Sequence, residues 1–102
     1  MGDFVRVATA AEIAPGGMKP VSVGGSHVVI CNVDGSYYAF HDQCTHECYP
    51  LSGGTLDGRV VTCLLHGARF DVATGEVLGP PAYEPVKTYP VRVDGDDILI
   101  AV

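Results

Sequence analysis

Short apolar runs, each followed by turn-forming residues, make up most of the chain. Near the C-terminus, Val91 and Val93 stand two positions apart, as do Ile98, Ile100 and Val102. A half-buried strand has this spacing, because its side chains point alternately to opposite faces of the sheet. Val, Ile, Tyr and Phe, which favour β-structure, are common in these runs. The pattern predicts strands at residues 27–33, 36–40, 59–63, 68–72, 89–93 and 97–102.

Glycine-containing turn signals separate the runs. Three of them are the Asp-Gly pairs at residues 34–35, 57–58 and 94–95. Both residues of such a pair can adopt positive φ, so we expect tight hairpin turns with Asp and Gly at their centre. Short strands joined in this way predict an all-β fold, an antiparallel β-sandwich or barrel of short strands.

Helix is expected in one segment only, residues 9–14. Thr9 can cap a helical turn there, with Glu12 three residues later, and Pro15-Gly16 would end it. The chain has 102 residues, and 47% of them are hydrophobic. This is a common size for a single domain and supplies enough apolar side chains for a core. With no repeat and no linker in the sequence, we expect one domain over residues 1–102.

The charge balance bears on possible partners. Twelve acidic residues stand against six basic ones, for a net charge of −6. Binding to nucleic acid or an anionic membrane requires clustered Lys and Arg, so neither is expected. No apolar run approaches the roughly 18–20 residues that cross a bilayer, and no secretory leader is apparent. We therefore expect a cytoplasmic protein; its acidity suits a basic partner but is also common among soluble proteins.

Two cysteine–histidine pairs lie in the middle of the chain. The first is Cys44-Thr45-His46 and the second is Cys63-Leu64-Leu65-His66, with sixteen residues, 47–62, between them. Cys44 follows the predicted strand 36–40, and Cys63 ends the predicted strand 59–63. Two loops at one end of a β-structure could bring the four side chains together. Thiolate and imidazole ligands suit zinc, copper and iron, so the pattern indicates a metal site.

Zinc is one interpretation, since two Cys and two His form a common structural tetrahedron. Zinc fingers, however, usually place two Cys on one arm and two His on the other. A binuclear iron–sulfur cluster can use one of each per loop, with both thiolates on one iron and both imidazoles on the other. His27 and His41 lie outside the pattern and are interpreted as surface or strand residues, and Cys31 as a small core residue.

Both pairs, with their spacing and the glycine after the second, resemble the Rieske [2Fe–2S] signature. The chain is similar to the Rieske-type ferredoxins of bacterial multicomponent ring-hydroxylating dioxygenase systems, closely over roughly residues 40–100 and in outline before them. Residues 79–81 resemble the proline-containing loop that covers the cluster in this family. The resemblance implies a Rieske fold with a small cluster-binding subdomain at about residues 42–82. It also implies one [2Fe–2S] cluster per chain, held by Cys44, His46, Cys63 and His66.

The resemblance implies a function as well. The chain is expected to be a soluble one-electron carrier rather than an enzyme, so no catalytic residue is assigned. It would take electrons from an NAD(P)H-dependent flavin ferredoxin reductase and pass them to a terminal Rieske non-haem iron oxygenase in aromatic hydrocarbon catabolism. Both partners would dock transiently at the cluster tip of a monomer, where the outer nitrogens of His46 and His66 are expected. Candidates for the docking rim are Glu47, Tyr49, Pro50 and Pro81.

The sequence departs from the pattern of other Rieske proteins in two ways. Relatives in respiratory and photosynthetic complexes join the loops by a disulfide, at positions that here hold Tyr49 and Leu65; we expect no such bond and a free thiol at Cys48. High-potential relatives also place a Ser and a Tyr where this chain has Ala68 and Phe70. Without those hydroxyl donors, we expect a potential near the low end of the Rieske range, about −150 mV.

Three other functions can be compared with these features. A Rieske oxygenase needs a second domain with a two-histidine, one-carboxylate iron site. Beyond the predicted ligands, only His27 and His41 remain for such a site. The small Rieske subunit of an assimilatory nitrite reductase, and a zinc-stapled interaction domain, stay open as alternatives.

Overall fold

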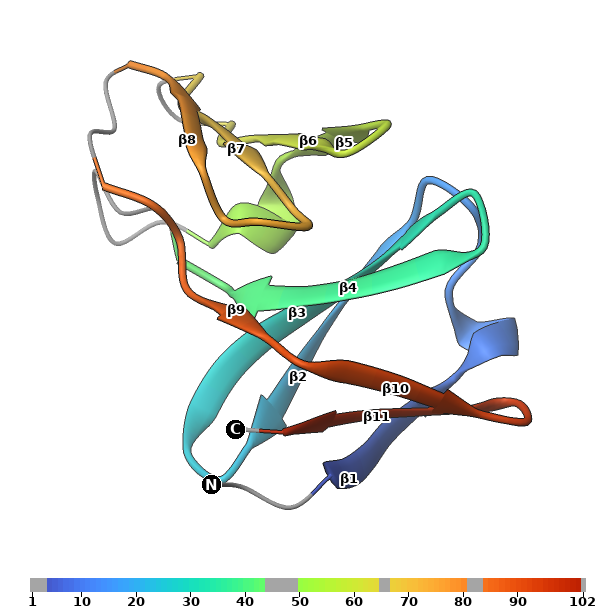
Figure 1. The fold of residues 1–102 in the computed structure, drawn as a ribbon. Helices are drawn as coiled ribbons and strands as arrows, with labels where there is room; N and C mark the ends of the chain where they lie inside the picture. The colour runs from blue at the N-terminus through green and yellow to red at the C-terminus, as the bar shows by residue number, and fades with distance from the viewer. Residues whose placement is uncertain (1–3, 44–49, 65–66, 81–83, 102) are drawn as a thin grey trace.

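The computed structural model describes residues 4–43, 50–64, 67–80 and 84–101 (Figure 1). They form three antiparallel sheets and two short 3-10 helices. The elements are β1 (Phe4–Thr9), η1 (Ala10–Glu12), β2 (Met18–Val23), β3 (Ser26–Val33), β4 (Ser36–His41), η2 (Leu51–Gly53), β5 (Thr55–Asp57), β6 (Val60–Thr62), β7 (Arg69–Asp71), β8 (Val77–Gly79), β9 (Thr88–Tyr89), β10 (Val91–Asp94) and β11 (Asp97–Ala101). The expected all-β class is confirmed.

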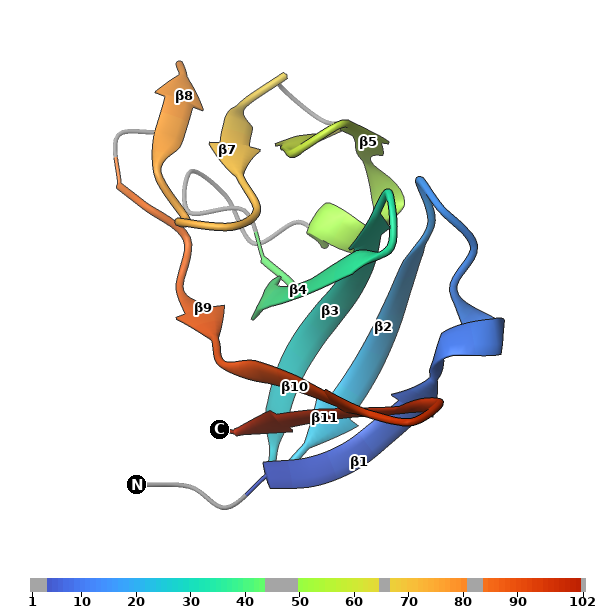
Figure 2. The same cartoon turned by 45° about the vertical axis from the view of Figure 1, so that its right-hand side comes forward.

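The chain divides into a larger and a smaller part. The larger part contains the sheets β1-β11-β10 and β2-β3-β4-β9, and the smaller part is the sheet β5-β6-β7-β8. Figures 1 and 2 show the small sheet at one end of the molecule, above β4, with the chain leaving β4 to form it and returning through β9. The small sheet, residues 55–79, falls within the range predicted for a cluster-binding subdomain.

β3 is buried on both faces, and this ties the two parts together. Val28 and Ile30 point to one side, into a core between the two larger sheets that we call the sandwich core. Val29 and Cys31 point to the other side, into a core shared with the small sheet that we call the junction core. Burial on both faces explains why this strand reads as a continuous apolar run. The sandwich core consists of Ala8, Ile13, Val28, Ile30, Ala39, Tyr89, Ile98 and Ile100. The junction core consists of Val29, Cys31, Phe40, Leu51, Val61, Cys63, Ala68, Phe70, Val72 and Val86.

The predicted strands are all present, with ends that differ by a few residues. Residues 89–93 fall in two strands, β9 and β10, because Pro90 lies between them. Ile98 and Ile100 are fully buried, as their alternation predicts, while Val102 lies outside the described residues. β1 and β2 were expected only in outline, and the three-residue strands β5 and β8 were not predicted.

The expected helical turn is present but short. Within the predicted segment only residues 10–12 are helical, and the second 3-10 helix, η2, was not predicted. Glu12 Oε2 accepts hydrogen bonds from the Thr9 N–H at 2.7 Å and the Thr9 hydroxyl at 3.1 Å. These contacts hold one turn at the N-terminal end. No helix among the described residues is long and apolar enough to cross a membrane.

The Asp-Gly turns follow the prediction at one site and depart from it at two. Asp34 and Gly35 both have positive φ, 50° and 91°, at the centre of the β3–β4 hairpin. The prediction is wrong at residues 57–58 and 94–95, where the Asp ends a strand and Gly58 or Gly95 takes the first turn position. Gly adopts positive φ without the steric cost that Asp meets, so a turn can begin at the Gly.

Candidate metal centre

Cys63 is the one predicted ligand within the described residues. It directly follows β6, is 2% exposed and lies in the junction core. Cys44, His46 and His66 lie outside the described residues, so the four-ligand site stays a prediction. Within the described part of the chain, no group of three or more His, Cys, Asp or Glu could hold a metal ion.

Two backbone hydrogen bonds close the base of the second predicted ligand loop. The Cys63 N–H donates to the Ala68 carbonyl at 2.7 Å, and the Gly67 N–H donates to the Cys63 carbonyl at 3.0 Å. Gly67 has a φ of 76°, a left-handed conformation that favours glycine. This requirement explains the glycine that follows the Cys-x-x-His motif. Cys63, directly after β6, and Ala68, directly before β7, are thus held next to each other.

A side-chain contact closes the base of the first predicted ligand loop. The Ser52 N–H donates to Asp42 Oδ1, and the Ser52 hydroxyl donates to Asp42 Oδ2, both at 2.7 Å. We call this pair the Asp42–Ser52 clasp. The Asp42 N–H also donates to the His27 carbonyl at 2.9 Å, which anchors the clasp to β3. The residues on either side of the segment that contains Cys44 and His46 are therefore held together.

The bases of the two loops lie against each other. Leu51, next to Ser52, is fully buried in the junction core together with Cys63 and Ala68. Gly54 touches the Thr62 carbonyl so closely that a side chain at position 54 would collide with it. Since Thr62 is the residue before Cys63, both predicted ligand segments start from one end of the small sheet.

The surroundings of Cys63 test whether an iron–sulfur group fits here. Cys63 forms no disulfide, and it shares the junction core with Ala68 and Phe70, both fully buried and without a hydroxyl. In the described residues, every buried side-chain nitrogen and oxygen has a hydrogen-bond partner. A soft sulfur donor in an apolar shell is the environment that iron–sulfur clusters occupy, so the described part of the site fits this group.

The other Cys and His residues within the described ranges are not predicted ligands. His27 on β3 is exposed, with its Nδ1 3.4 Å from the Ser22 hydroxyl, and His41 is half-buried at the end of β4. Cys31 is fully buried on β3, and burial raises the pKa of its thiol to about 12. Cys31 is thus a neutral core residue, as predicted.

Of the candidate rim residues, Pro50 is exposed, while Glu47, Tyr49 and Pro81 lie outside the described residues. So does Cys48, whose predicted free thiol stays a prediction.

Asp71 supports the small sheet in a way that the sequence reading missed. Its Oδ1 accepts the Ala73 N–H at 2.8 Å and the Thr74 N–H at 3.2 Å, and its Oδ2 accepts the Arg59 guanidinium at 2.9 Å. Burial raises the pKa of Asp71, but these donors outweigh it and the net pKa is lowered. The clasp was missed too; the one signal in the sequence is a carboxylate two residues before Cys44.

The chain is also similar to known proteins. A family model described as the Rieske [2Fe–2S] domain matches residues 3–90. The biphenyl dioxygenase ferredoxin subunit of Pseudomonas sp. (strain KKS102) is 47% identical over 98 residues, which cover 95% of this chain and 90% of that protein.

Two solved structures are also similar. The ferredoxin of carbazole 1,9a-dioxygenase from Nocardioides aromaticivorans IC177 superimposes with a TM-score of 0.93 and is 37% identical, with 96% of each chain covered. A chain from a complex of reduced oxygenase and oxidized ferredoxin in carbazole 1,9a-dioxygenase gives a TM-score of 0.91 and is 34% identical, with 96% of this chain and 92% of that chain covered.

Proposed function

Because the chain belongs to the Rieske [2Fe–2S] domain family, we propose that it is the ferredoxin of a ring-hydroxylating dioxygenase system. It carries electrons one at a time to a terminal oxygenase. The observation that carries this proposal is the 47% identity to a biphenyl dioxygenase ferredoxin over 95% of this chain and 90% of that protein. The similarity thus extends over 90% of a ferredoxin component, not only over a Rieske domain within a larger oxygenase. The chain is an electron-transfer subunit rather than a catalytic one.

The proposed ligands of its [2Fe–2S] cluster are Cys44, His46, Cys63 and His66. Three observations on described residues support this choice. Cys63 is buried in an apolar core, the loop that contains His66 is closed by the Cys63–Ala68 hydrogen bond, and the loop that contains Cys44 and His46 is closed by the Asp42–Ser52 clasp. Both loops start from the same end of the small sheet.

When bound, the [2Fe–2S] cluster supplies reversible one-electron chemistry. The chain supplies the buried, apolar junction core as a base for it. The junction core fixes the starting points of both loops, so electron uptake requires little movement of the described residues. Ala68 and Phe70 offer no side-chain hydroxyl to a ligand sulfur, and the chain carries a net charge of −6. Both features disfavour an added electron, which supports the expected low potential.

The finer parts of the proposal concern the partners. A flavin-dependent ferredoxin reductase supplies the electrons, and the protein works as a monomer that docks transiently through the end carrying the two loops. Exposed Pro50 borders that end. Transient redox interfaces are small and polar at their rim, which suits a carrier that must release one partner before meeting the next.

Electron delivery to an oxygenase tests the proposal. The chemically reduced protein is mixed anaerobically with the oxidised terminal oxygenase of a biphenyl dioxygenase, and the oxygenase spectrum is followed by stopped flow. We expect the oxygenase to be reduced as the ferredoxin is reoxidised, one electron per chain. If the biphenyl, naphthalene and carbazole dioxygenase oxygenases all stay oxidised, the proposed function is wrong.

A further inference from the structure

The six basic residues of this acidic chain are not equivalent. Four of them are already engaged in the structure: Arg6 with Asp97 at 3.6 Å, Lys19 with Glu12 at 3.1 Å, Arg59 with Asp71 at 2.9 Å, and Lys87 over the Tyr89 ring at 5.1 Å. The other two, Arg69 and Arg92, have no ion pair or hydrogen bond from their side chains within the described residues. They are the cations that are free to meet a partner.

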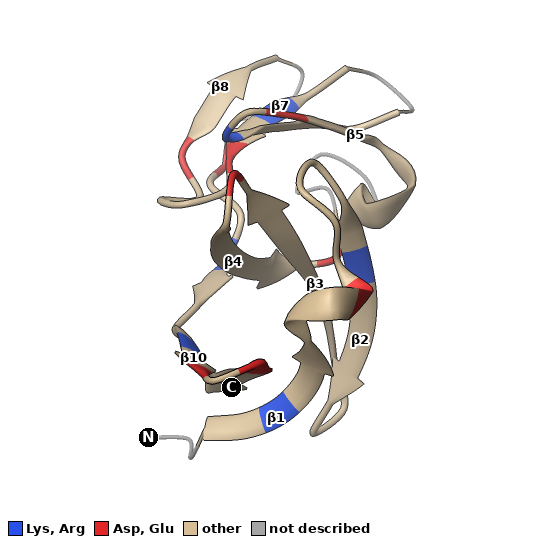
Figure 3. Ribbon diagram, turned by 90° about the vertical axis from the view of Figure 1, so that its right-hand side faces the viewer, with Lys and Arg blue, Asp and Glu red and all other residues tan. Residues whose placement is uncertain are grey.

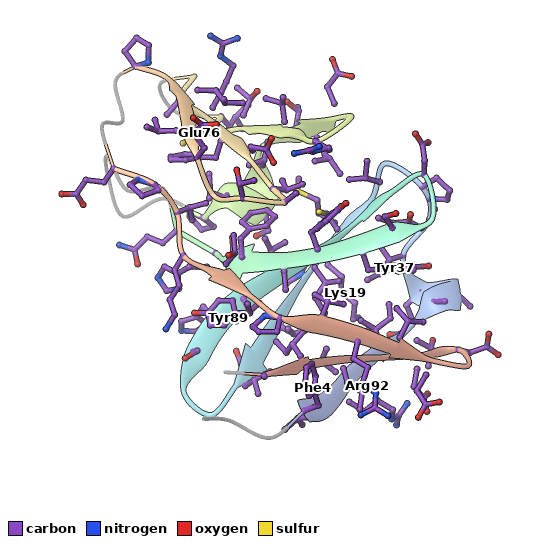
Figure 4. The ribbon with its side chains drawn as sticks, viewed as in Figure 1. Phe4, Lys19, Tyr37, Glu76, Tyr89 and Arg92 are labelled. Carbon is purple, nitrogen blue, oxygen red and sulfur yellow. The ribbon has the colours of Figure 1, made fainter. Side chains whose placement is uncertain are left out.

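The two free arginines lie at opposite ends of the molecule. Arg69 is on β7 of the small sheet, and Arg92 is on β10 of the three-stranded sheet. Figure 3 shows basic segments of β7 and β10 at these two ends, and Figure 4 labels Arg92 far from Glu76, which precedes β8. Both side chains are exposed. Replacing either arginine by a neutral residue removes one positive charge, in each case from a different end of the molecule.

Arg69 is seated on a glycine. Its side chain lies against Gly79 of β8, the residue paired with it across the sheet. A Cβ built on Gly79 would lie 2.9 Å from Arg69 Nη2, 3.1 Å from Nε and 3.4 Å from Cζ. Nη2 and Nε are thus nearer to this position than Cζ is, so the guanidinium turns its Nε–Nη2 edge toward Gly79. A seated guanidinium loses less conformational entropy when it forms a bidentate pair than a freely moving side chain does.

Arg69 lies at the end of the small sheet from which both predicted ligand loops start. Arg69 pairs with Thr62 across the β6–β7 ladder, one residue before Cys63. Two large apolar side chains of this end are exposed: Leu64, next to Cys63, at 62%, and Leu78, next to Gly79, at 41%. An unpaired cation thus shares this end of the sheet with exposed apolar surface, the composition of a small protein interface.

We propose that Arg69, seated on Gly79 and accompanied by Leu64 and Leu78, is a docking contact that takes a carboxylate on the terminal oxygenase. This inference rests on the proposed function, which makes the oxygenase the electron acceptor. The net charge of −6 attracts a basic surface from a distance, and Arg69 then selects a carboxylate within that surface. No internal ion pair has to break for Arg69 to bind, since its guanidinium has none in the described structure.

The test compares Arg69→Gln with Arg92→Gln, which remove the same charge from opposite ends. The readout is the second-order rate constant for electron transfer from reduced ferredoxin to oxidised oxygenase at low salt. We expect a loss of about fivefold for Arg69→Gln, the size of one favourable ion pair, and less than about twofold for Arg92→Gln. The reduction potential of both variants is measured as well and is expected to match that of the wild type.

Gly79→Ala tests the seat itself, because it keeps every charge and displaces the guanidinium. We expect it to reduce the rate constant in the same direction as Arg69→Gln. Equal losses for Arg69→Gln and Arg92→Gln, or a loss confined to the reaction with the reductase, would overturn the inference. A wild-type protein that passes no electrons to the oxygenase would instead overturn the proposed function, so the two failures are distinguishable.

Discussion

The Asp42–Ser52 clasp gives the most direct test of how the chain holds its first ligand loop. Asp42→Ala removes both carboxylate contacts, each 2.7 Å long, and leaves the Ser52 N–H without its acceptor. A hydrogen bond to a charged group contributes about 1.5–3 kcal/mol, and the lower value applies here because Asp42 is only half-buried. Two such bonds give a loss of about 3 kcal/mol in the free energy of unfolding. Ser52→Ala removes one contact and should cost about half as much.

Urea unfolding of both variants measures the stability loss, and bleaching of the visible absorbance in the presence of an iron chelator measures cluster retention. We expect Asp42→Ala to lose its absorbance faster than Ser52→Ala, and both faster than the wild type, because a looser loop exposes its ligands more often. Asp96→Ala and Ser36→Ala are matched controls, since both side chains are exposed and neither is part of the clasp. If Asp42→Ala unfolds and bleaches like Asp96→Ala, the clasp does not hold the loop.

Three further predictions follow from single residues. Folding lowers the pKa of Asp71, so the stability that its carboxylate contributes is present above the ordinary aspartate pKa of about 3.9 and is lost as the pH falls through the lower folded-state value. The free energies of unfolding of wild type and Asp71→Asn, measured by urea titration, should therefore converge in acid. A difference that stays constant with pH would contradict this. The Cys31 thiol, with its pKa raised to about 12, should resist alkylation in the folded protein at neutral pH, and mass spectrometry that finds it labelled before unfolding would refute its burial. Ala68→Ser should raise the reduction potential by placing a hydroxyl near Cys63, whereas Ala101→Ser on the distant sheet should not; a redox titration that shows no difference would contradict the hydrogen-bond explanation.

Features that depend on neighbouring residues were the ones that the sequence predicted well. The apolar run of β3, the Asp34-Gly35 turn and the Thr9–Glu12 contact all follow from local spacing. The positions of the Asp57-Gly58 and Asp94-Gly95 turns were wrong by one residue, because strand register, not turn chemistry alone, decides which residue begins the turn. Burial of β3 on both faces was likewise beyond local pattern, since it requires the small sheet to pack on the larger part.

In the candidate site, too, local spacing predicted some features, while others depend on how the chain folds. Cys63 could be chosen as a candidate ligand from the spacing of Cys and His alone, and its role as a ligand stays a prediction. The Asp42–Ser52 clasp and the Arg69–Gly79 seat could not, because each joins residues ten positions apart that no periodic pattern relates. Such contacts depend on how the chain folds back on itself, and only the three-dimensional arrangement reveals them.

The visible and EPR spectra of the purified protein test the central claim most directly, namely that two cysteines and two histidines of this chain hold a [2Fe–2S] cluster. The spectra are recorded before and after reduction with dithionite, together with a metal analysis. We predict a red-brown protein whose reduced form gives a rhombic EPR signal with an average g value below that of the free electron. A colourless protein with one zinc per chain would contradict the account and make the same ligands a structural staple.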